Sequence, residues 1–247
     1  MGTARKLLCR IGGMDVSVIA HHDKLYNELK PYTVESGEPL FEIDAPDERL
    51  AAVRERSKIV PKRMPFELME HFFAGQIFYE RMPDFDGFML HSSCVDLDGR
   101  AYLFSADSGV GKSTHTRLWR DHFGDRVKML NDDKPLIRLI DGKYYACGTP
   151  WCGKHGLHDN SMSPIQAVAH IVRSEKNYIR RIGAEEAFRH LFQQTFMQIR
   201  DKGRMERLLA LWDGFVENVS IYELGCNISD EAVEVAYNGM YNGIMTE

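Results

Sequence analysis

Long apolar runs are missing from this sequence of 247 residues, and none approaches the roughly 20 residues that a helix needs to cross a bilayer. The first residues, from Met1 to Lys6, are charged, but no apolar stretch follows them, so a secretory signal is not indicated. These two absences predict a cytoplasmic protein that has no membrane partner.

Cysteine is scarce: the chain has 5, an odd number, and no C-x-x-C pair. A framework of disulfides is therefore not indicated, and we expect reduced thiols. The spacing of Cys147 and Cys152 is not one of the usual zinc patterns.

A basic patch is missing as well. The net charge is -5, and the lysines and arginines are spread along the chain. A nucleic acid would need a concentrated positive surface, so no nucleic-acid partner is predicted.

The sequence does contain enough hydrophobic residues, 44%, for a large core or for a core and a small subdomain. We predict an α/β fold with a mixed sheet, flanking helices and a small β-rich N-terminal part. Residues 1–84 would form the N-terminal β/α region, and residues 85–247 would form the main domain. Repeats and low-complexity linkers are not found.

The expected elements follow from the spacing of apolar residues. Two Asp-Gly pairs, at Asp98 and Asp141, indicate tight hairpins. The aromatic stripe in the helix at 65–82 is expected to be core, and Asp44 is the candidate N-cap of the preceding helix. Strands are predicted at 7–11, 16–20, 88–97, 101–105, 128–130, 136–140, 144–147, 167–172 and 219–224, and helices at 44–56, 65–82, 113–123, 184–196, 204–216 and 230–241.

The clearest functional signal is the segment from Ala106 to Ser113, which reads Ala-Asp-Ser-Gly-Val-Gly-Lys-Ser. It lies between a predicted strand and a predicted helix, which is the setting of a Walker A phosphate-binding loop, or P-loop. Gly109 and Gly111 let the backbone wrap around phosphates, and the helix N-terminus adds N–H donors. Ala106 replaces the first glycine of the usual pattern, and we expect this small residue to be tolerated.

We expect the loop to bind ATP or GTP together with Mg²⁺. Lys112 would reach the β- and γ-phosphates, and the Ser113 hydroxyl would bind the metal. The predicted nucleotide-binding residues are Asp107, Ser108, Gly109, Val110, Gly111, Lys112, Ser113 and Thr114.

Two adjacent acids, Asp132 and Asp133, follow a short predicted strand 20 residues after Lys112. A kinase needs one carboxylate for the metal and, when the acceptor is a hydroxyl, one that takes its proton. Such a pair is also common in solvated turns, and the following Lys134-Pro135 fits that alternative. Beside a P-loop, we favour the catalytic interpretation.

Together these residues resemble the catalytic domain of HPr kinase/phosphorylase, whose fold is related to that of the ATP-dependent phosphoenolpyruvate carboxykinases. The resemblance covers roughly residues 87–175 and depends on the stretch from His91 to Gly99, on the P-loop, and on the acidic pair. It implies a P-loop kinase.

The resemblance also implies individual roles. Lys112 matches the phosphate-binding lysine and Ser113 the magnesium ligand. Asp133 matches the proton acceptor that activates the substrate serine. His91 matches a histidine of the active site, whereas from the residues alone it would be a core histidine on a strand.

This sequence departs from the family in two places. The region from Cys147 to Gly156 lacks the acidic metal ligand found there, so we assign more of the metal binding to Asp132. The late Gly-Arg-Asn segment has no counterpart, so neither HPr as substrate nor the phosphorylase reaction is carried over. In the same region Lys154 could bind the acceptor, or Trp151 could simply plug the core. Arg181 is a further candidate for an anionic acceptor.

The sequence therefore predicts an enzyme, a kinase that transfers the γ-phosphoryl group to a hydroxyl. The acceptor could be a serine of a small protein or peptide, or a small-molecule alcohol. Two alternatives remain: a carboxykinase-like lyase acting on a keto acid, and a nucleotide-sensing module without catalysis. Whether the chain forms a homo-oligomer stays open.

Overall fold

The computed structural model describes residues 4–242. The chain divides into two compact units, Met1–Arg81 and Met82–Glu247. Each unit has hydrophobic clusters of its own. The mixed α/β architecture expected from the sequence is present.

The first unit contains a small three-stranded sheet in the order β1-β2-β3. β1 and β2 form an antiparallel hairpin, and β3 pairs with β2 in parallel. The hairpin turn is made by Gly12 and Gly13, both with positive φ. The elements of this unit are β1 (Arg5–Ile11), β2 (Met14–Ala20), α1 (Asp23–Leu29), η1 (Lys30–Tyr32), β3 (Glu42–Asp44), α2 (Asp47–Arg56) and α3 (Phe66–Arg81).

One expectation for this unit is wrong, and another holds for most but not all of its residues. The helix α2 starts after Pro46 without a side-chain cap, while Asp44 ends β3 and accepts a bond from the His21 ring at 2.8 Å. The aromatic stripe of α3 is only partly core, because Phe78 is buried whereas Phe72 is 45% exposed. A 16-residue helix on a three-stranded sheet cannot bury all of its apolar face.

The second unit is built on one large mixed sheet whose path runs β4-β8-β9-β10-β6-β5-β7. In addition, β12 pairs with β10, and β11 pairs with β12. Its elements are η2 (Met82–Phe85), β4 (Gly87–Met89), β5 (Ser93–Leu97), β6 (Arg100–Ser105), α4 (Lys112–Phe123), η3 (Gly124–Arg126), β7 (Val127–Asn131), β8 (Leu136–Ile140), β9 (Lys143–Cys147), β10 (Met162–Arg173), β11 (Tyr178–Arg181), α5 (Ala184–Leu191), η4 (Phe192–Gln194), α6 (Lys202–Asn218), β12 (Ile221–Cys226) and α7 (Asp230–Asn242).

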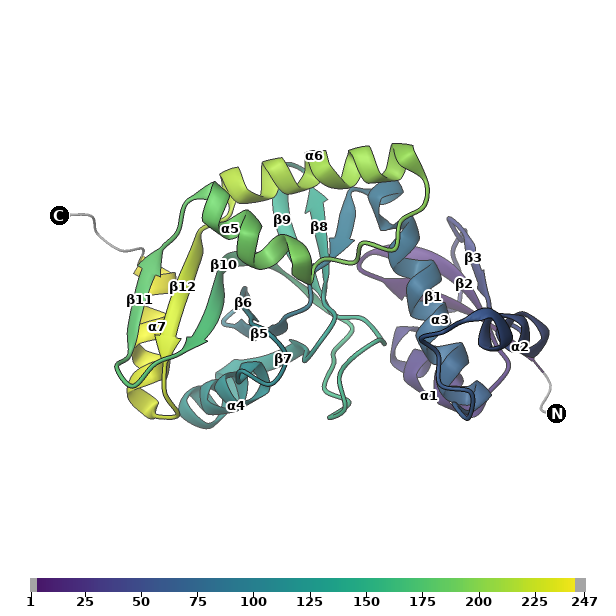
Figure 1. Cartoon of the computed structure of the whole chain (residues 1–247), viewed down its shortest axis with the longest axis horizontal. Helices are drawn as coiled ribbons and strands as arrows, with labels where there is room; N and C mark the ends of the chain where they lie inside the picture. The colour runs from purple at the N-terminus through teal and green to yellow at the C-terminus, as the bar shows by residue number, and fades with distance from the viewer. Residues whose placement is uncertain (1–3, 243–247) are drawn as a thin grey trace. The chain divides into compact units, whose positions relative to one another are not determined.

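The helices of this unit cover both faces of the sheet (Figure 1). On one face α5 and α6 pack over the strands through Trp212 and Phe215, and Leu103 belongs to that cluster. On the other face α4 and α7 pack through Trp119, and the neighbours of Leu103, Tyr102 and Phe104, point to that side. This alternation is the period of two expected of a strand buried on both faces.

The two Asp-Gly hairpins are confirmed. Asp98-Gly99 joins β5 to β6, and Asp141-Gly142 joins β8 to β9. All four residues have positive φ, between 48° and 80°, which is the backbone of a type I′ turn.

The strand predicted at 88–97 is wrong in one respect that matters for the site. It is broken into β4, which pairs with β8, and β5, which pairs with β6 and β7. His91 lies in the break and is therefore free of the ladder of either strand.

Within residues 4–242, no helix is long and apolar enough to cross a membrane. All five cysteines lie in this part of the chain, and none forms a disulfide.

Candidate functional site

The sheet brings four separate segments to one edge. β10 runs parallel to β6, with His170 opposite Ser105, so the end of β10 lies beside the start of the P-loop. β5 is antiparallel to both β6 and β7, with Cys94 opposite Asn131. The residues before β5, the P-loop after β6 and the acidic pair after β7 therefore meet at the same edge.

The P-loop backbone has glycine where glycine is required. Gly109 has φ 77° and Gly111 has φ 141°, whereas Ala106 is not among the described residues with positive φ. Nothing lies within 4 Å of the position where a Cβ would stand on either glycine, so the restriction is conformational. Ala106 is fully buried, and its conformation explains why the loop tolerates alanine there.

Lys112 is the first residue of α4 and is held by the loop itself. Its Nζ donates to the Ala106 carbonyl at 2.9 Å. Burial lowers the pKa of Lys112, while the nearby carboxylates of Asp133 and Asp107 act in the opposite direction. An ammonium that is partly desolvated and donates to a carbonyl would gain strongly from a phosphate oxygen.

The Asp133 carboxylate faces the loop and is fixed from two sides. Its Oδ1 lies 3.0 Å from His91 Nε2, and its Oδ2 is paired with Lys134. The other ring nitrogen of His91, Nδ1, lies 2.9 Å from Gln194 Oε1. The amide of Gln194 continues to Asp107 Oδ1 at 3.4 Å, so this chain of bonds links the acid to the P-loop.

These contacts set the charge of Asp133. Burial by itself would raise the pKa of its carboxyl, but the bond from His91 and the Lys134 ammonium outweigh burial, and the pKa lies well below its usual range. Asp133 is therefore a carboxylate at neutral pH, oriented by its neighbours.

The neighbouring acid, Asp132, is buried and turned to a different partner. Its Oδ1 accepts from the Gly153 amide at 2.5 Å. Its backbone carbonyl accepts from the Ser93 hydroxyl at 2.8 Å. The two adjacent acids therefore occupy distinct environments, as a division of tasks between them requires.

A cavity of about 580 Å³ unites these groups. Its walls include Lys112 and Ser113 of the P-loop side and Asp132 and Asp133 of the acid side. Also in the walls are His91, Ser108, Gly109, Gly111, Thr114, Gly153, Lys154 and His155.

The loop from Gly148 to Ser161 forms one wall and is anchored by Asn131. The Asn131 Nδ2 donates to the Thr149 carbonyl at 3.0 Å, while its Oδ1 accepts from the amides of Asp133 and Lys134. One buried side chain thus positions both the acidic turn and the loop.

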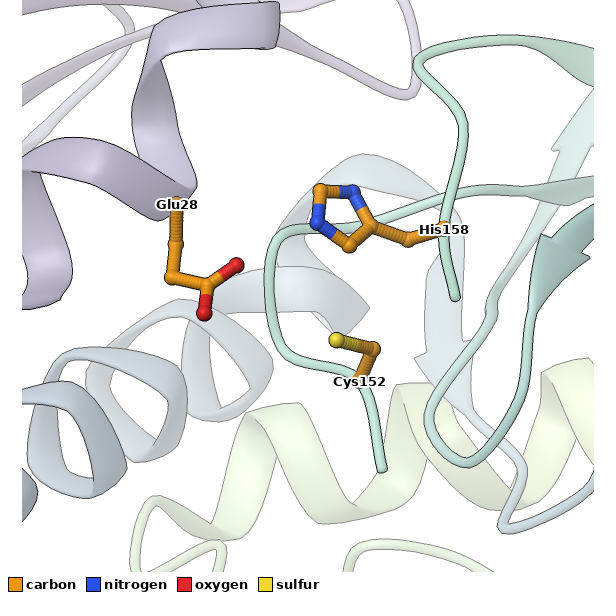
Figure 2. A group of neighbouring side chains, drawn as sticks. All are labelled: Glu28, Cys152 and His158. Atoms are coloured by element: carbon orange, nitrogen blue, oxygen red, sulfur yellow. The ribbon is translucent and has the colours of Figure 1, made fainter. Parts of the chain in front are cut away.

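A second part of the same loop, residues 157–159, is held against the end of β7. The Asp132 amide donates to the Leu157 carbonyl at 3.1 Å, and the Asp159 amide donates to the Leu130 carbonyl at 3.1 Å. Across the loop, the Cys152 thiol and a ring nitrogen of His158 lie within 4.8 Å of each other (Figure 2). Lys154 and His155 lie at the exposed tip of the loop.

The structure places the two residues named in the alternative interpretations of this loop differently. Trp151 is 2% exposed and fills the interior, as one alternative held. Lys154 lies in the wall of the cavity, and its binding of an acceptor stays a prediction. Arg181 is exposed on β11 and is not among the residues that line the cavity.

Three residues of the site were not found by sequence reasoning. Gln194 and Asn131 hold the acids and the histidine, and Arg173 braces the P-loop. The Arg173 Nη2 donates to the Gly109 carbonyl at 2.7 Å. Asn131 had a detectable signal, since asparagine before two acids at a strand end typically forms a turn. Gln194 and Arg173 are distant in sequence from the residues that they contact, and no sequence pattern pointed to them.

The chain matches no protein-family model and no curated protein. Among solved structures, it is similar to the HPr(Ser) kinase/phosphatase from Coxiella burnetii, over 60% of this chain and 91% of that one, with 8% sequence identity and a TM-score of 0.34. A likeness of this size does not establish the activity of this chain.

Proposed function

We propose that this chain is a phosphotransferase that moves the γ-phosphoryl group of a nucleoside triphosphate to a hydroxyl. One observation carries the proposal: a P-loop and an oriented carboxylate, Asp133, form facing parts of the wall of one cavity. A loop that only binds nucleotide would not require a carboxylate held by a histidine at that place.

The phosphate side of the site needs little rearrangement. The backbone of Gly109 and Gly111 and the N-terminus of α4 offer N–H groups to the β- and γ-phosphates. Lys112 exchanges its bond with the Ala106 carbonyl for one with a phosphate oxygen. The Arg173 guanidinium keeps the loop in its shape by bonding the carbonyl side of the loop.

The residues also fit a magnesium ion. The Ser113 hydroxyl and the Asp132 carboxylate are hard oxygen donors in the wall of the same cavity, which is the donor type that Mg²⁺ selects. When bound, the metal would neutralise charge that develops on the transferring phosphoryl group. Asp132 is already oriented by the Gly153 amide.

Asp133 would act on the acceptor. Its carboxylate accepts a hydrogen bond from the attacking hydroxyl and takes the proton as the new P–O bond forms. The bond between the γ-phosphorus and the β–γ bridging oxygen breaks, and the products are a nucleoside diphosphate and a phosphate monoester. A carboxylate of low pKa is a weak base, so its main contribution is positioning, with proton transfer late in the reaction.

Binding of Mg²⁺ with ATP or GTP is the first test, by calorimetry on the full chain. Lys112→Ala should weaken binding by about tenfold to 100-fold, because a charged donor to phosphate is lost. Asp133→Asn should bind nucleotide within a few-fold of the natural chain. Asp125→Asn, in the exposed turn η3, is the matched control for removing one negative charge.

Transfer is the second test, with γ-labelled ATP and two acceptor pools, serine-containing peptides and small-molecule alcohols. Asp133→Asn should reduce labelling by about 100-fold or more. Full nucleotide affinity in the Lys112→Ala variant would overturn the assignment of the P-loop. Labelling that is unchanged in Asp133→Asn would overturn the role of the acid, and tight binding without transfer to either pool would favour a nucleotide sensor.

A further inference from the structure

A second cavity, of about 550 Å³, adjoins the phosphate site. It shares Gly109, Gly111 and Thr114 with the first cavity. Its other walls come from α4, from the end of β10 and from the residues after β12. A chain of phosphates bound over the loop would therefore continue directly into this second space.

One part of the wall of the second cavity is aliphatic, and the remainder includes the polar residues Arg173, Ser174, Glu175 and Asn227. Leu118 comes from α4, Ile171 from β10, and Ile228 from the segment that follows β12. Ile228 is 75% exposed, an unusual position for a large aliphatic side chain. Aliphatic walls of this kind suit the flat faces of an aromatic base.

His115 adds one polar group to these walls. It is 3% exposed, and its Nε2 lies 3.0 Å from the indole Nε1 of Trp119. An indole nitrogen can only donate, so Nε2 must be the acceptor and the ring proton must sit on Nδ1. This Nδ1 is buried and has no hydrogen-bond partner among residues 4–242.

Aromatic neighbours hold the imidazole of His115 in place. The ring is fixed between Phe104, at 4.7 Å between centroids, and Trp119. A buried donor without a partner is rare in folded proteins, and a bound molecule would satisfy it.

We infer that the second cavity holds the nucleoside part of the donor nucleotide, with its base against Leu118, Ile171 and Ile228, and that His115 Nδ1–H donates to an acceptor atom of that nucleoside. The inference rests on the proposed function, since it places the remainder of the same nucleotide. It makes His115 a residue that distinguishes a nucleotide from a plain phosphate chain.

The test compares two ligands, ATP and inorganic tripolyphosphate, each with Mg²⁺, on the full chain. Two variants of His115 separate its two nitrogens. His115→Asn keeps a polar atom at the δ position, and His115→Gln keeps one at the ε position, where Trp119 donates. We expect His115→Gln to weaken ATP binding by about threefold to tenfold, the effect of one neutral hydrogen bond, and His115→Asn to weaken it less. Tripolyphosphate binding should be the same in both.

Ile228→Ser provides an independent variant, because an exposed residue can be changed without disturbing the core. It should weaken ATP binding by about two- to fivefold and leave tripolyphosphate binding unchanged. Circular dichroism and the thermal midpoint establish that each variant is folded.

The outcomes separate this inference from the proposed function. A natural chain that binds neither ligand overturns the proposed function. A natural chain that binds both ligands equally leaves the phosphate site standing but overturns the nucleoside cavity. Equal ATP affinity in His115→Asn and His115→Gln overturns the role of Nδ1, and an Ile228→Ser chain with full ATP affinity overturns the placement of the base.

Discussion

At the scale of single residues, the P-loop separates positions that need glycine from one that does not. Gly111 has φ 141° and Gly109 has φ 77°, which are backbone conformations that other residues adopt only at a cost. Ala106 stands where the usual motif has glycine, outside that region of φ. The departure from the usual motif therefore carries no penalty in this chain.

The prediction is a contrast between two substitutions. Gly111→Ala should weaken the binding of Mg-tripolyphosphate by about tenfold or more, because the loop must leave the conformation that presents its N–H groups. Ala106→Gly should change that affinity by less than about threefold. Calorimetry on both variants measures the effect. Equal losses in the two would show that the loop conformation is not what binds phosphate.

The charge of His115 has a consequence for stability. In the folded chain burial lowers the pKa of its imidazole from the ordinary value of 6.5 to about 4, so between these values the unfolded chain binds more protons than the folded chain. Stability must then fall as the pH falls through this window. Between pH 7 and pH 5 we expect His115 alone to remove on the order of 2 kcal/mol from the free energy of unfolding.

Urea unfolding at the two pH values measures this loss, with His115→Gln as the variant that cannot titrate. All three tryptophans, Trp119, Trp151 and Trp212, lie in the second unit, so their fluorescence reports on the unit that contains His115. The natural chain should lose more stability than the variant on going to pH 5. Parallel losses in the two chains would mean that the imidazole is not held neutral.

At the scale of elements, Arg173 connects the end of β10 to the P-loop after β6. Its guanidinium donates to the Gly109 carbonyl at 2.7 Å and to the Val110 carbonyl at 3.4 Å. Both bonds are made to carbonyl groups of the loop and not to the N–H groups that would bind phosphate. The side chain of one strand therefore fixes the shape of the loop that follows its neighbour.

Replacing Arg173 with methionine keeps the length of the side chain and removes both bonds. We expect Arg173→Met to weaken Mg-tripolyphosphate binding by about threefold to tenfold, with Arg173→Lys intermediate because it retains one donor. The thermal midpoint should change little, since the side chain is exposed. Unaltered affinity in the methionine variant would show that the loop keeps its shape without the brace.

Elements defined by local rules could be predicted from the sequence. The helix α4 and the two Asp-Gly hairpins depend on neighbouring residues, and the structure has them. The break at His91 was not predicted. The polar run from His91 to Ser93 interrupts the apolar pattern, but it does not tell which strands the two halves pair with. Local patterns do not contain that information.

The same distinction holds for the candidate site. The P-loop and the acidic pair are contiguous motifs, and the fold brings them to one cavity. The hydrogen bond between His91 and Gln194 joins residues 103 positions apart. The hydrogen bond from Arg173 to the Gly109 carbonyl joins residues 64 positions apart. These partners are set by the order of strands in the sheet, which a single sequence does not specify.

At the scale of the whole molecule, the second unit contains every described residue that lines either cavity. It also contains the two large hydrophobic clusters on the faces of its sheet. The first unit, Met1–Arg81, has a smaller cluster around Met69 and contributes no residue to the walls of these cavities. The proposed chemistry thus depends on one unit with its own core.

A chain of residues 82–247 should therefore fold and bind Mg-tripolyphosphate and MgATP within about threefold of the full chain, because the residues that line both cavities are all retained. Tryptophan fluorescence and a cooperative thermal transition report folding, and calorimetry measures affinity. Lys112→Ala in the shorter chain is the control for specific binding. A folded shorter chain that has lost affinity for both ligands would show that Met1–Arg81 contributes to the site itself, whereas loss of transfer alone would assign that unit to the acceptor.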